Sequence, residues 1–257
     1  MKTVLTIAGS DSSGGAGIQA DIKTMTANGV YAMSAITALT AQNTMGVRQI
    51  VEVTPAFLQE QLEACLEDIS ADAVKIGMLP SVDQVQVVAT VLKKYKIEKI
   101  VTDPVMVATS GSVLMKDGTR NIHAELLFPM STLITPNIPE AEALTGMRIT
   151  NQEEMEQAAE ILYRKYGCNV LLKGGHSVEN ASDVLCEKGA LTWFRGTPVD
   201  TDNTHGTGCT LSSSIASNLA KGYSLNESVS LGKGYVTRAL AAGLNLGKGN
   251  GPLNHMV

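Results

Sequence analysis

The chain has few of the features that would link it to nucleic acid or to thiol-based metal chemistry. Three Phe and one Trp among 257 residues leave little aromatic surface for stacking on bases. A formal net charge of −5 argues against a strongly basic face, so nucleic acid is not expected as a partner. The four cysteines are scattered and none forms a C-x-x-C pair, which argues against a zinc site and a redox dithiol.

Long apolar runs are missing as well. The apolar run at the N-terminus ends at Gly9, which is too short for the core of a secretory signal peptide. No stretch approaches the ~18 apolar residues of a membrane span, so no membrane association is expected. Together with cysteines that we expect to be free thiols, these absences predict a cytoplasmic protein.

Three common enzyme motifs are absent. Gly9 and Gly14 have the spacing of a Walker A motif, but Gly15 and Ala16 stand where that motif has Lys and Ser or Thr. Neither a G-x-S-x-G nucleophile motif nor an H-E-x-x-H zinc motif occurs, which weakens hydrolase interpretations. The glycine-rich segment 9–17 is therefore either a ligand-binding loop or a plain flexible connection.

What the sequence does contain is a regular alternation of apolar strands and amphipathic helices, in a chain with 44% hydrophobic residues. Strands are predicted at residues 3–8, 30–41, 47–53, 73–77, 99–105, 131–137 and 169–174, with a β-hairpin over 184–194. Helices are predicted at residues 18–29, 55–69, 81–95, 122–127, 139–144, 152–166, 207–222 and 226–244. The alternation predicts a three-layer α/β fold, in which helices cover both faces of a mostly parallel sheet. No linker divides the chain, so residues 1–257 are predicted to form a single domain, with a glycine-rich and loose C-terminus.

Residues 200–222 combine a glycine-rich turn with the start of a helix. Gly206 and Gly208 allow the backbone to turn tightly and to approach a ligand closely. Unpaired backbone N–H groups and the helix dipole at such a start favour a phosphate or an oxyanion, and the thiol of Cys209 lies in the first turn. Many helices begin with Gly-Thr-Gly without binding a ligand, so the turn alone leaves both interpretations open.

Polar residues follow the predicted strands, at the edge of the sheet where α/β proteins bind ligands. The residues expected there are Ser10, Asp11, Gln42, Met78, Asp103, Asn137, Glu140, Lys173 and residues 204–209. A single carboxylate such as Asp103 or Glu140 can simply cap a helix. Acidic groups, a lysine and an anion-binding helix start together fit phosphoryl transfer, in which carboxylates hold Mg²⁺ and cationic groups offset phosphate charge.

The histidines and one long polar segment say less about function than the residues at the strand ends. His205 lies in the glycine-rich turn and is predicted to be solvent-accessible, in a structural or ligand-contacting role, because no second His sits at metal-ligand spacing. The other three, His123, His176 and His255, are predicted to be ordinary surface residues. The polar segment 106–118 is predicted to be a mobile loop or lid.

Six motifs occur in a fixed order along the chain. They are residues 8–21 (AGSDSSGGAGIQAD), 40–44 (TAQNT), 75–79 (KIGML), 102–105 (TDPV), 135–140 (TPNIPE) and 203–209 (NTHGTGC). In this order they resemble the hydroxymethylpyrimidine/phosphomethylpyrimidine kinase family of the ribokinase superfamily, over about residues 2–250. The resemblance implies a ribokinase-like fold and ATP-dependent phosphorylation of 4-amino-5-hydroxymethyl-2-methylpyrimidine. The monophosphate would then be phosphorylated to the diphosphate, for thiamine biosynthesis.

The resemblance also implies roles for particular residues. It implies a pyrimidine pocket of Gly9, Asp21, Gln42, Met78 and Val105, an ATP site of Lys173, Thr204, His205 and Lys233, and a magnesium site of Asp103, Asn137 and Glu140. Backbone amides of Gly206 to Cys209 would form the catalytic anion hole. Gln42 suits an aminopyrimidine edge because a side-chain amide offers both donors and an acceptor. A homodimer is implied as well.

Cys209 stands where most of the superfamily carries an Asp general base, whereas this subfamily typically has Cys. A helix N-terminus lowers the pKa of a thiol from its usual ~8.5, so Cys209 is expected to be a weak base or a reactive contact. If it is a base, replacing Cys209 by Ala should slow the first phosphorylation more than the second. The attacking phosphate of the second step is already anionic and needs little help from a base.

Three alternative functions remain open. A pyridoxal kinase of the same subfamily shares the glycine loop and the His-Gly-x-Gly-Cys turn; Gln42 favours the pyrimidine, and dual activity stays possible. A transferase with Cys209 as nucleophile, activated by His205, has doubtful geometry because only four residues separate the two. A nucleotide-binding sensor without catalysis is disfavoured by the joint presence of Asp103, Glu140 and Lys173.

Overall fold

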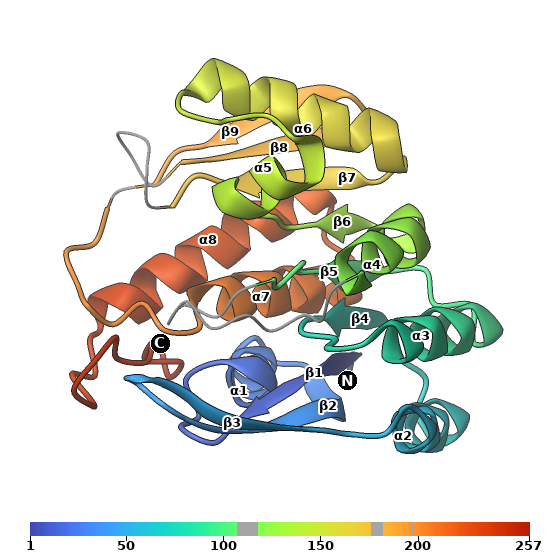
Figure 1. The fold of residues 1–257 in the computed structure, drawn as a ribbon. Helices are drawn as coiled ribbons and strands as arrows, with labels where there is room; N and C mark the ends of the chain where they lie inside the picture. Colours follow the sequence, from blue (N-terminus) through green and yellow to red (C-terminus); the bar gives the residue numbers. More distant parts are fainter. Residues whose placement is uncertain (107–117, 176–181, 197) are drawn as a thin grey trace.

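The computed structural model describes residues 1–106, 118–175, 182–196 and 198–257. In this part of the chain nine strands form one sheet, in the order β3-β2-β1-β4-β5-β6-β7-β8-β9 (Figure 1). The strands are β1 (Thr3–Asp11), β2 (Tyr31–Asn43), β3 (Gly46–Glu52), β4 (Ala73–Ile76), β5 (Ile100–Thr102), β6 (Leu133–Ile134), β7 (Asn169–Lys173), β8 (Asp183–Glu187) and β9 (Ala190–Phe194).

The strands from β2 to β7 in this order are parallel, and antiparallel strands complete both edges. Parallel neighbours require crossover connections, which the helices between them supply. The register of β1 against β2 shifts between Ala8 and Ser10, which places the irregularity at Gly9. The carboxyl ends of the parallel strands therefore gather at one edge, as the predicted fold requires.

Three helices cover one face of the sheet: α1 (Gly17–Ala27), α7 (Thr207–Lys221) and α8 (Leu225–Ala241). Val4, Val101 and Leu171 of the strands pack against Leu211 and Ile215 of α7 in one apolar cluster. Helix α7 lies between the sheet, α1 and α8, and every residue from Thr210 to Ala220 is buried (Figure 1). Such packing holds the amino end of α7 in a fixed position at the sheet edge.

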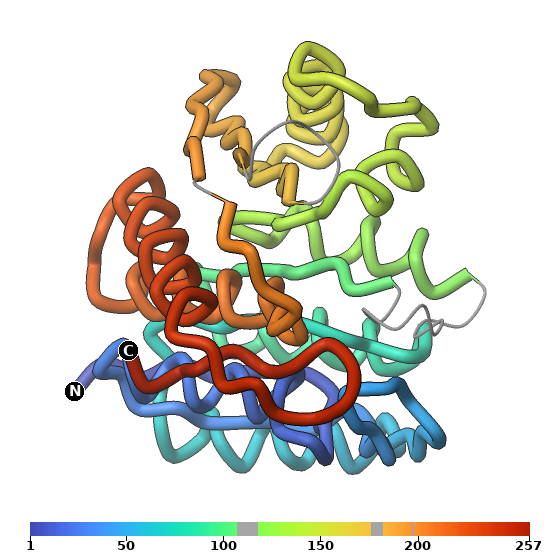
Figure 2. The backbone as a smooth tube through the Cα atoms, turned by 90° about the vertical axis from the view of Figure 1, so that its left-hand side faces the viewer, coloured from blue at the N-terminus to red at the C-terminus, as the bar shows by residue number. Residues whose placement is uncertain are grey.

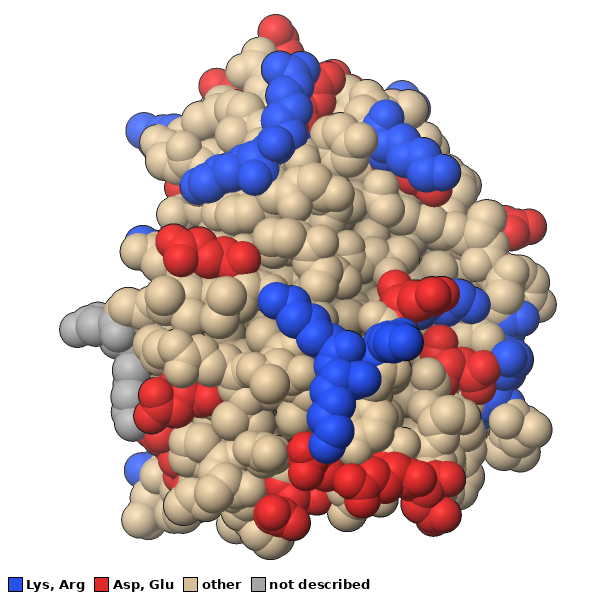
Figure 3. Space-filling view, turned by 90° about the vertical axis from the view of Figure 1, so that its right-hand side faces the viewer, with Lys and Arg blue, Asp and Glu red and all other residues tan. Residues whose placement is uncertain are grey.

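The opposite face is covered by α2 (Pro55–Asp68), α3 (Val82–Lys94), α4 (Thr119–Leu127), α5 (Ile138–Thr145) and α6 (Gln152–Tyr166), with a short 3₁₀ helix over Phe128–Met130. Pro55 occupies the first turn of α2, a position that needs no N–H donor. On the side that Figure 3 shows, Lys and Arg side chains lie beside Asp and Glu side chains. Lys94 of α3 and Glu63 of α2 are 2.9 Å apart.

The structure confirms the predicted α/β class and the edge elements. The predicted edge strand appears as β3, and the predicted hairpin as β8 and β9. Its turn residues Lys188 and Gly189 have φ of 50° and 83°, the left-handed pair that a tight hairpin turn requires. None of the helices in the described ranges has the length and apolar character needed to cross a membrane.

The predicted loose C-terminus is wrong. Leu253 is 1% exposed and His255 is 5% exposed, because the tail packs along α8 and the edge of the sheet. Tyr235 donates its hydroxyl proton to the carbonyl of His255 at 2.7 Å, and the N–H groups of Lys248 and Gly249 lie 3.2 Å from Thr44 Oγ1. Figure 2 shows the red tail beside blue N-terminal segments. The tail is part of the wall near the glycine-rich loop.

Two smaller differences concern element ends. Strand β2 continues through Asn43, so Gln42 lies within the strand, opposite Val47 of β3, and not after it. Helix α8 ends at Ala241, earlier than predicted, and Gly243 follows with a left-handed φ of 43°. Two predictions fall outside the described residues. The predicted loop over 106–118 does so except for Met106 and Gly118, and so does the predicted surface residue His176.

Candidate active site

A buried ion pair lies at the carboxyl ends of two parallel strands. Lys173 ends β7, and its Nζ lies 2.9 Å from Oδ1 of Asp103, which follows β5. Thr135 Oγ1, after β6, donates to the same oxygen at 2.9 Å. Burial opposes ionisation of Asp103, but Lys173 and Lys75 outweigh it and hold its pKa below the usual value. Burial likewise opposes the charge of Lys173, and the neighbouring carboxylates raise its pKa, so both partners are ionised.

The amino end of α7 faces this ion pair. Gly206 caps the helix with φ of 88°, where any side chain would collide with the backbone of the glycine-rich loop. A Cβ at Gly208 would lie 3.4 Å from both Asp103 Oδ2 and Lys173 Nζ. Within the described residues, the backbone N–H groups of Gly208 and Cys209 have no acceptor. Free N–H groups, the positive end of the helix dipole and a lysine form a site for a phosphate anion.

Asn137 and Glu140 start α5 beside the same ion pair. Asn137 Oδ1 accepts from the N–H of Glu140 at 2.9 Å, and Glu140 Oε2 accepts from the N–H of Asn137 at 2.8 Å, which makes a capping box. Burial raises the pKa of Glu140 to about 7, in spite of the nearby Lys173. Glu140 therefore does cap the helix, as one interpretation of the sequence proposed, but only through Oε2. Its other oxygen, Oε1, is not part of the capping box.

The donor set fits a magnesium ion that is shared with a phosphate ligand. Mg²⁺ is usually held by one or two carboxylates together with substrate phosphates and water. Asp103 and Glu140 supply two buried carboxylates, and the raised pKa of Glu140 means that an added cation would stabilise its ionised form. Across the described ranges, no group of three His, Cys, Asp or Glu side chains forms a closed metal cage.

A second buried network lies under the first turns of α7. Lys75 of β4 and Asp21 of α1 form an ion pair at 2.9 Å, with both side chains 0% exposed. Asp21 also accepts hydrogen bonds from Thr6 Oγ1 and Ser213 Oγ, each at 2.6 Å. Asp21, which was predicted to line the pyrimidine pocket, is fully buried in this network. Its carboxylate faces groups of the chain itself and ties α1, β1, β4 and α7 together beneath the site.

The thiol of Cys209 does not have the predicted acidity. Burial raises the pKa of Cys209 to about 11, and Lys75 opposes this rise only in part. The backbone N–H of Gly17 donates to the sulfur and favours the thiolate, but the carboxylates of Asp21 and Asp103 disfavour it. We therefore correct the expectation that the helix start acidifies this thiol: at neutral pH Cys209 is protonated and is poorly suited to accept a proton.

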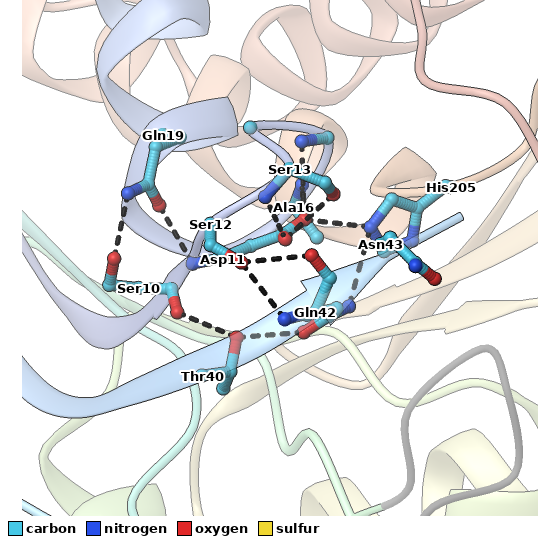
Figure 4. Close-up of polar contacts among 12 residues, drawn as sticks. Ser10, Asp11, Ser12, Ser13, Ala16, Gln19, Thr40, Gln42, Asn43 and His205 are labelled. Carbon is cyan, nitrogen blue, oxygen red and sulfur yellow. Dashed lines mark hydrogen bonds and ion pairs between the residues drawn. The ribbon is translucent and has the colours of Figure 1, made fainter. Parts of the chain in front are cut away.

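Gln42 and His205 meet on the other side of the α7 start, at the glycine-rich loop (Figure 4). The Nε2 atoms of Gln42 and His205 are 3.4 Å apart, and His205 Nε2 is 2.8 Å from Asp11 Oδ2. His205 is 6% exposed because its ring packs against Gly15 and its backbone pairs with Pro252, so its predicted solvent exposure is wrong. His205, which was predicted to contact ATP, thus contacts the strand that carries Gln42.

The remaining predicted pocket residues lie around the end of β1. The side chain of Met78 covers Gly9, since a Cβ at Gly9 would lie 2.7 Å from Met78 Cε. Val105 lies two residues after Asp103, beyond the end of β5, and is half-buried, with its N–H donating to the carbonyl of Asp103 at 2.8 Å. A pocket of about 220 Å³ opens next to Gln42 and His205, and its other lining residues are Asn43, Thr44, Met45, Gly46, Gly249 and Asn250.

Thr204 and Lys233, the other two residues predicted for the ATP site, are held by contacts within the chain. The carbonyl of Thr204 accepts hydrogen bonds from the N–H and hydroxyl of Thr207, which shapes the turn into α7. Lys233 of α8 forms an ion pair with Asp183 at 2.6 Å, and the other oxygen of Asp183 accepts the N–H of Gly174 at 3.0 Å. Lys233 is thereby anchored next to the end of β7, on the Lys173 side.

Two other histidines are buried where a surface position was predicted. His123 of α4 is 1% exposed and lies edge-on to Phe128, with ring centroids 5.5 Å apart. His255, in the C-terminal tail, has its Nε2 3.1 Å from Thr210 Oγ1 of α7. In both cases burial lowers the histidine pKa to about 4, so each ring is neutral at neutral pH.

Sequence reasoning assigned no role to Lys75, and it gave Asp11 only a place at the sheet edge. Lys75 had a signal, because it is the one charged residue in the otherwise apolar strand Ala73–Ile76. A lysine inside such a strand needs a buried carboxylate partner. Asp11 had no comparable signal, since its partner His205 is distant in sequence and is brought near only by the fold.

The fold and the site together define a class of protein. A ribokinase-like α/β sheet, with a Lys-Asp pair at its strand ends and an uncapped helix start facing it, is the arrangement of a small-molecule kinase. Comparison with known proteins agrees: a profile described as phosphomethylpyrimidine kinase matches residues 11–254. The chain belongs to the phosphomethylpyrimidine kinase family.

Individual relatives are similar over the whole chain. The chain is 49% identical to the thiamine biosynthesis bifunctional protein of Geobacter sulfurreducens, over 99% of this chain and 52% of that protein. It is 43% identical to the hydroxymethylpyrimidine/phosphomethylpyrimidine kinase of Bacillus subtilis, over 98% and 94% of the two chains. An ADP complex of Bacillus subtilis pyridoxal kinase superposes with a TM-score of 0.92 at 35% identity, over 99% and 97%. The chain thus spans about half of the bifunctional relative and nearly all of the other two.

Proposed function

We propose that this protein phosphorylates 4-amino-5-hydroxymethyl-2-methylpyrimidine with ATP, and then phosphorylates the monophosphate to the diphosphate, for thiamine biosynthesis. The observation that carries the proposal is the amino end of α7: Gly208 lies against Asp103 and Lys173, and free N–H groups point outward. Membership of the family and the identity to named kinases of this pathway support the choice of substrate.

The transferred phosphoryl group is stabilised by the chain's own donors. Lys173 and the N–H groups of Gly208 and Cys209 offset its negative charge. Thr204 and Lys233 border the ATP phosphates from either side. Because phosphoryl transfer passes through a loose transition state, positioning and charge stabilisation suffice, and a strong base is not required.

A divalent ion belongs to this proposal. Asp103 and Glu140, with Asn137 orienting Glu140 through the capping box, would hold Mg²⁺. When bound, Mg²⁺ neutralises charge on the phosphate oxygens. Burial, with a smaller contribution from the charge of Asp103, raises the pKa of Glu140, and a bound cation would favour its ionised form.

The acceptor would sit between the glycine-rich loop and β2. Gly9 and Met78 would contact its ring, Val105 would close the edge towards Asp103, and Gln42 would bind the aminopyrimidine edge. Asp21 would act indirectly, by fixing Lys75 and α7 beneath the acceptor hydroxyl. Cys209, as a neutral thiol, would shape this floor and would not remove the hydroxyl proton.

We further propose that residues 1–257 act as one kinase domain in the cytoplasm, as a homodimer. One continuous sheet runs through the described strands, and the four cysteines are free, as a reducing compartment favours. Leu39 and Val51 are cross-strand neighbours at the sheet edge and are 50% and 55% exposed, so a second copy has apolar surface to cover there. Light scattering of the purified protein would measure the mass of the assembly.

A second activity, phosphorylation of pyridoxal, is favoured by one observation: the TM-score of 0.92 to a pyridoxal kinase. Release of ADP, measured with each acceptor separately at saturating ATP, tests both functions at once. We expect the larger kcat/KM for the aminopyrimidine, and Lys173→Met serves as a control with strongly reduced activity. A larger kcat/KM for pyridoxal would contradict the proposed main substrate.

A further inference from the structure

The Asp11 carboxylate is the centre of a hydrogen-bond network that the phosphoryl-transfer chemistry does not use. It is 3% exposed and lies at the end of β1. Its Oδ1 accepts from the N–H of Ser13 at 2.8 Å and from the Ser13 hydroxyl at 2.7 Å, and its Oδ2 accepts from the N–H groups of Gly15 at 3.1 Å and Ala16 at 2.9 Å. Burial opposes ionisation, but these donors and His205 lower the pKa of Asp11 to about 2. Asp11 is therefore a pure acceptor at neutral pH.

The state of His205 follows from this partner. Its Nε2 lies 2.8 Å from Asp11 Oδ2, and an ionised carboxylate can only accept, so Nε2 carries a proton. The ring cannot turn away easily. A Cβ at Gly15 would collide with ring atom Cδ2, and the backbone N–H of His205 donates to the carbonyl of Gly251 at 3.0 Å. A donor is therefore fixed at this point of the loop.

This donor decides which way the amide of Gln42 points. Gln42 Nε2 is 3.4 Å from His205 Nε2, and Gln42 Oε1 is 3.1 Å from Thr40 Oγ1 (Figure 4). In that orientation two N–H donors face each other. Amide oxygen and nitrogen are assigned from the hydrogen-bond network, and here the network demands their exchange. After exchange, Gln42 Oε1 faces the protonated Nε2 of His205. The single Nε2 proton then makes its short bond to Asp11 Oδ2 at 2.8 Å and a second, longer contact to Gln42 Oε1. Gln42 Nε2 donates to Thr40 Oγ1, whose own proton goes to the carbonyl of Ser10 at 2.9 Å.

We propose that Asp11 and His205 form a positioning pair that fixes the polarity of the Gln42 amide and thereby selects the acceptor substrate. One N–H and one lone pair of Gln42 remain for a ligand, in a set order. They match a ring that carries an amino donor next to a nitrogen acceptor, as in an aminopyrimidine, and do not match a ring without that amino group. The inference rests on the proposed function and assigns His205 to the acceptor side of the site.

The test compares two acceptors in three variants. His205→Leu removes the donor, and His205→Gln returns an N–H near the same place. His255→Leu is a matched control, because His255 is also buried against α7 but contacts Thr210 and not Gln42. The acceptors are the aminopyrimidine and the same pyrimidine without its amino group, and kcat, acceptor KM and ATP KM are measured for each.

His205→Leu should raise the KM for the aminopyrimidine about 10-fold, the worth of one hydrogen bond, and leave kcat and the ATP KM within about twofold. The preference for the aminopyrimidine over the deamino analogue should fall by the same factor, His205→Gln should restore most of it, and His255→Leu should keep it. An unchanged preference, or a rise in the ATP KM with either acceptor, would overturn the proposal.

The hydrogen bond between His205 and Asp11 can be tested without measuring enzyme activity. In a ¹⁵N spectrum of histidine-labelled wild-type protein at neutral pH, the Nε2 of His205 should show the shift of a protonated nitrogen. A lone pair on Nε2 would overturn the pair itself. Wild-type protein that phosphorylates neither acceptor would instead refute the proposed function, so the two failures are distinguishable.

Discussion

The proposed phosphate side and the proposed acceptor side of the α7 start are built on different principles. On the phosphate side, Asp103, Lys173 and Glu140 are charged or chargeable, and N–H groups of the helix start are left open. On the acceptor side, Asp11 and His205 already satisfy one another and the loop around them. The phosphate side is incomplete without an anion and a cation, whereas the acceptor side is set before any ligand arrives.

The difference follows from what each ligand brings. ATP carries charge, and open donors in a buried site interact with it strongly. An uncharged ring carries only hydrogen-bond donors and acceptors, and selection among such rings depends on groups held in one orientation. One short turn, from His205 to Cys209, serves both purposes because its residues point to opposite sides.

The largest effect is expected on the free energy of unfolding, when the Lys75–Asp21 ion pair beneath the site is broken. Lys75→Met leaves the completely buried Asp21 without its cation and should lower the free energy of unfolding by about 3–5 kcal/mol. Removing both charges, in Lys75→Met with Asp21→Asn, should recover much of that loss. Urea denaturation measures both variants, and a loss below about 1 kcal/mol for the single variant would show that the pair does not support the site.

Next in size is a change confined to the phosphate side. Lys173→Met removes the cation next to Gly208 and should lower kcat by about 10²–10³-fold, with the acceptor KM nearly unchanged, if the two sides are independent. Steady-state kinetics with the aminopyrimidine measure this, and Lys233→Met provides a comparison on the same side. An equal rise in acceptor KM would break the division between the two sides.

Within the described part of the chain, His123 is a buried histidine that has no carboxylate partner, in contrast to His205 with Asp11. The folded-state pKa of His123, about 4, lies below its ordinary 6.5, so the unfolded chain takes up a proton first as pH falls. The stability from keeping this ring neutral is complete above pH 6.5 and is lost as pH falls towards 4, by up to about 3 kcal/mol.

Among the described residues, Nε2 of His123 has no hydrogen-bond partner, so Phe at this position should be tolerated next to Phe128. His123→Phe should remove this share of the acid destabilisation, as measured by urea denaturation at pH 7 and pH 4.5. His255, whose pKa shifts in the same direction, continues to contribute in the variant. An unchanged difference between the two pH values would contradict the burial of a neutral His123.

The smallest effect is expected at the thiol. Because burial raises the pKa of Cys209 to about 11, Cys209→Ala should slow both phosphorylation steps by similar factors, each below about 10-fold, through lost packing. The kcat of the wild type and the variant should also change in parallel between pH 6 and 9. A selective loss of the first step would restore the role of base that the sequence suggested.

The sequence predicted the phosphate side far better than the acceptor side. Asp103, Glu140, Lys173 and Gly208 follow strand ends or open a helix, so spacing along the chain suffices to bring them together. His205 was misplaced because its burial depends on Gly15, on Asp11 and on a C-terminal tail that looked loose. The pKa of Cys209 was misjudged because helix position is visible in the sequence, and desolvation is not.

The central claim is that this chain adds phosphoryl groups from ATP to the hydroxymethyl aminopyrimidine. Mass spectrometry of the products after incubation with ATP and Mg²⁺ tests it most directly. The account predicts a monophosphate that appears first and a diphosphate that accumulates later, with both formed far more slowly by Lys173→Met. The account would be contradicted if the wild-type protein formed no phosphorylated pyrimidine, whether or not it phosphorylated pyridoxal under the same conditions.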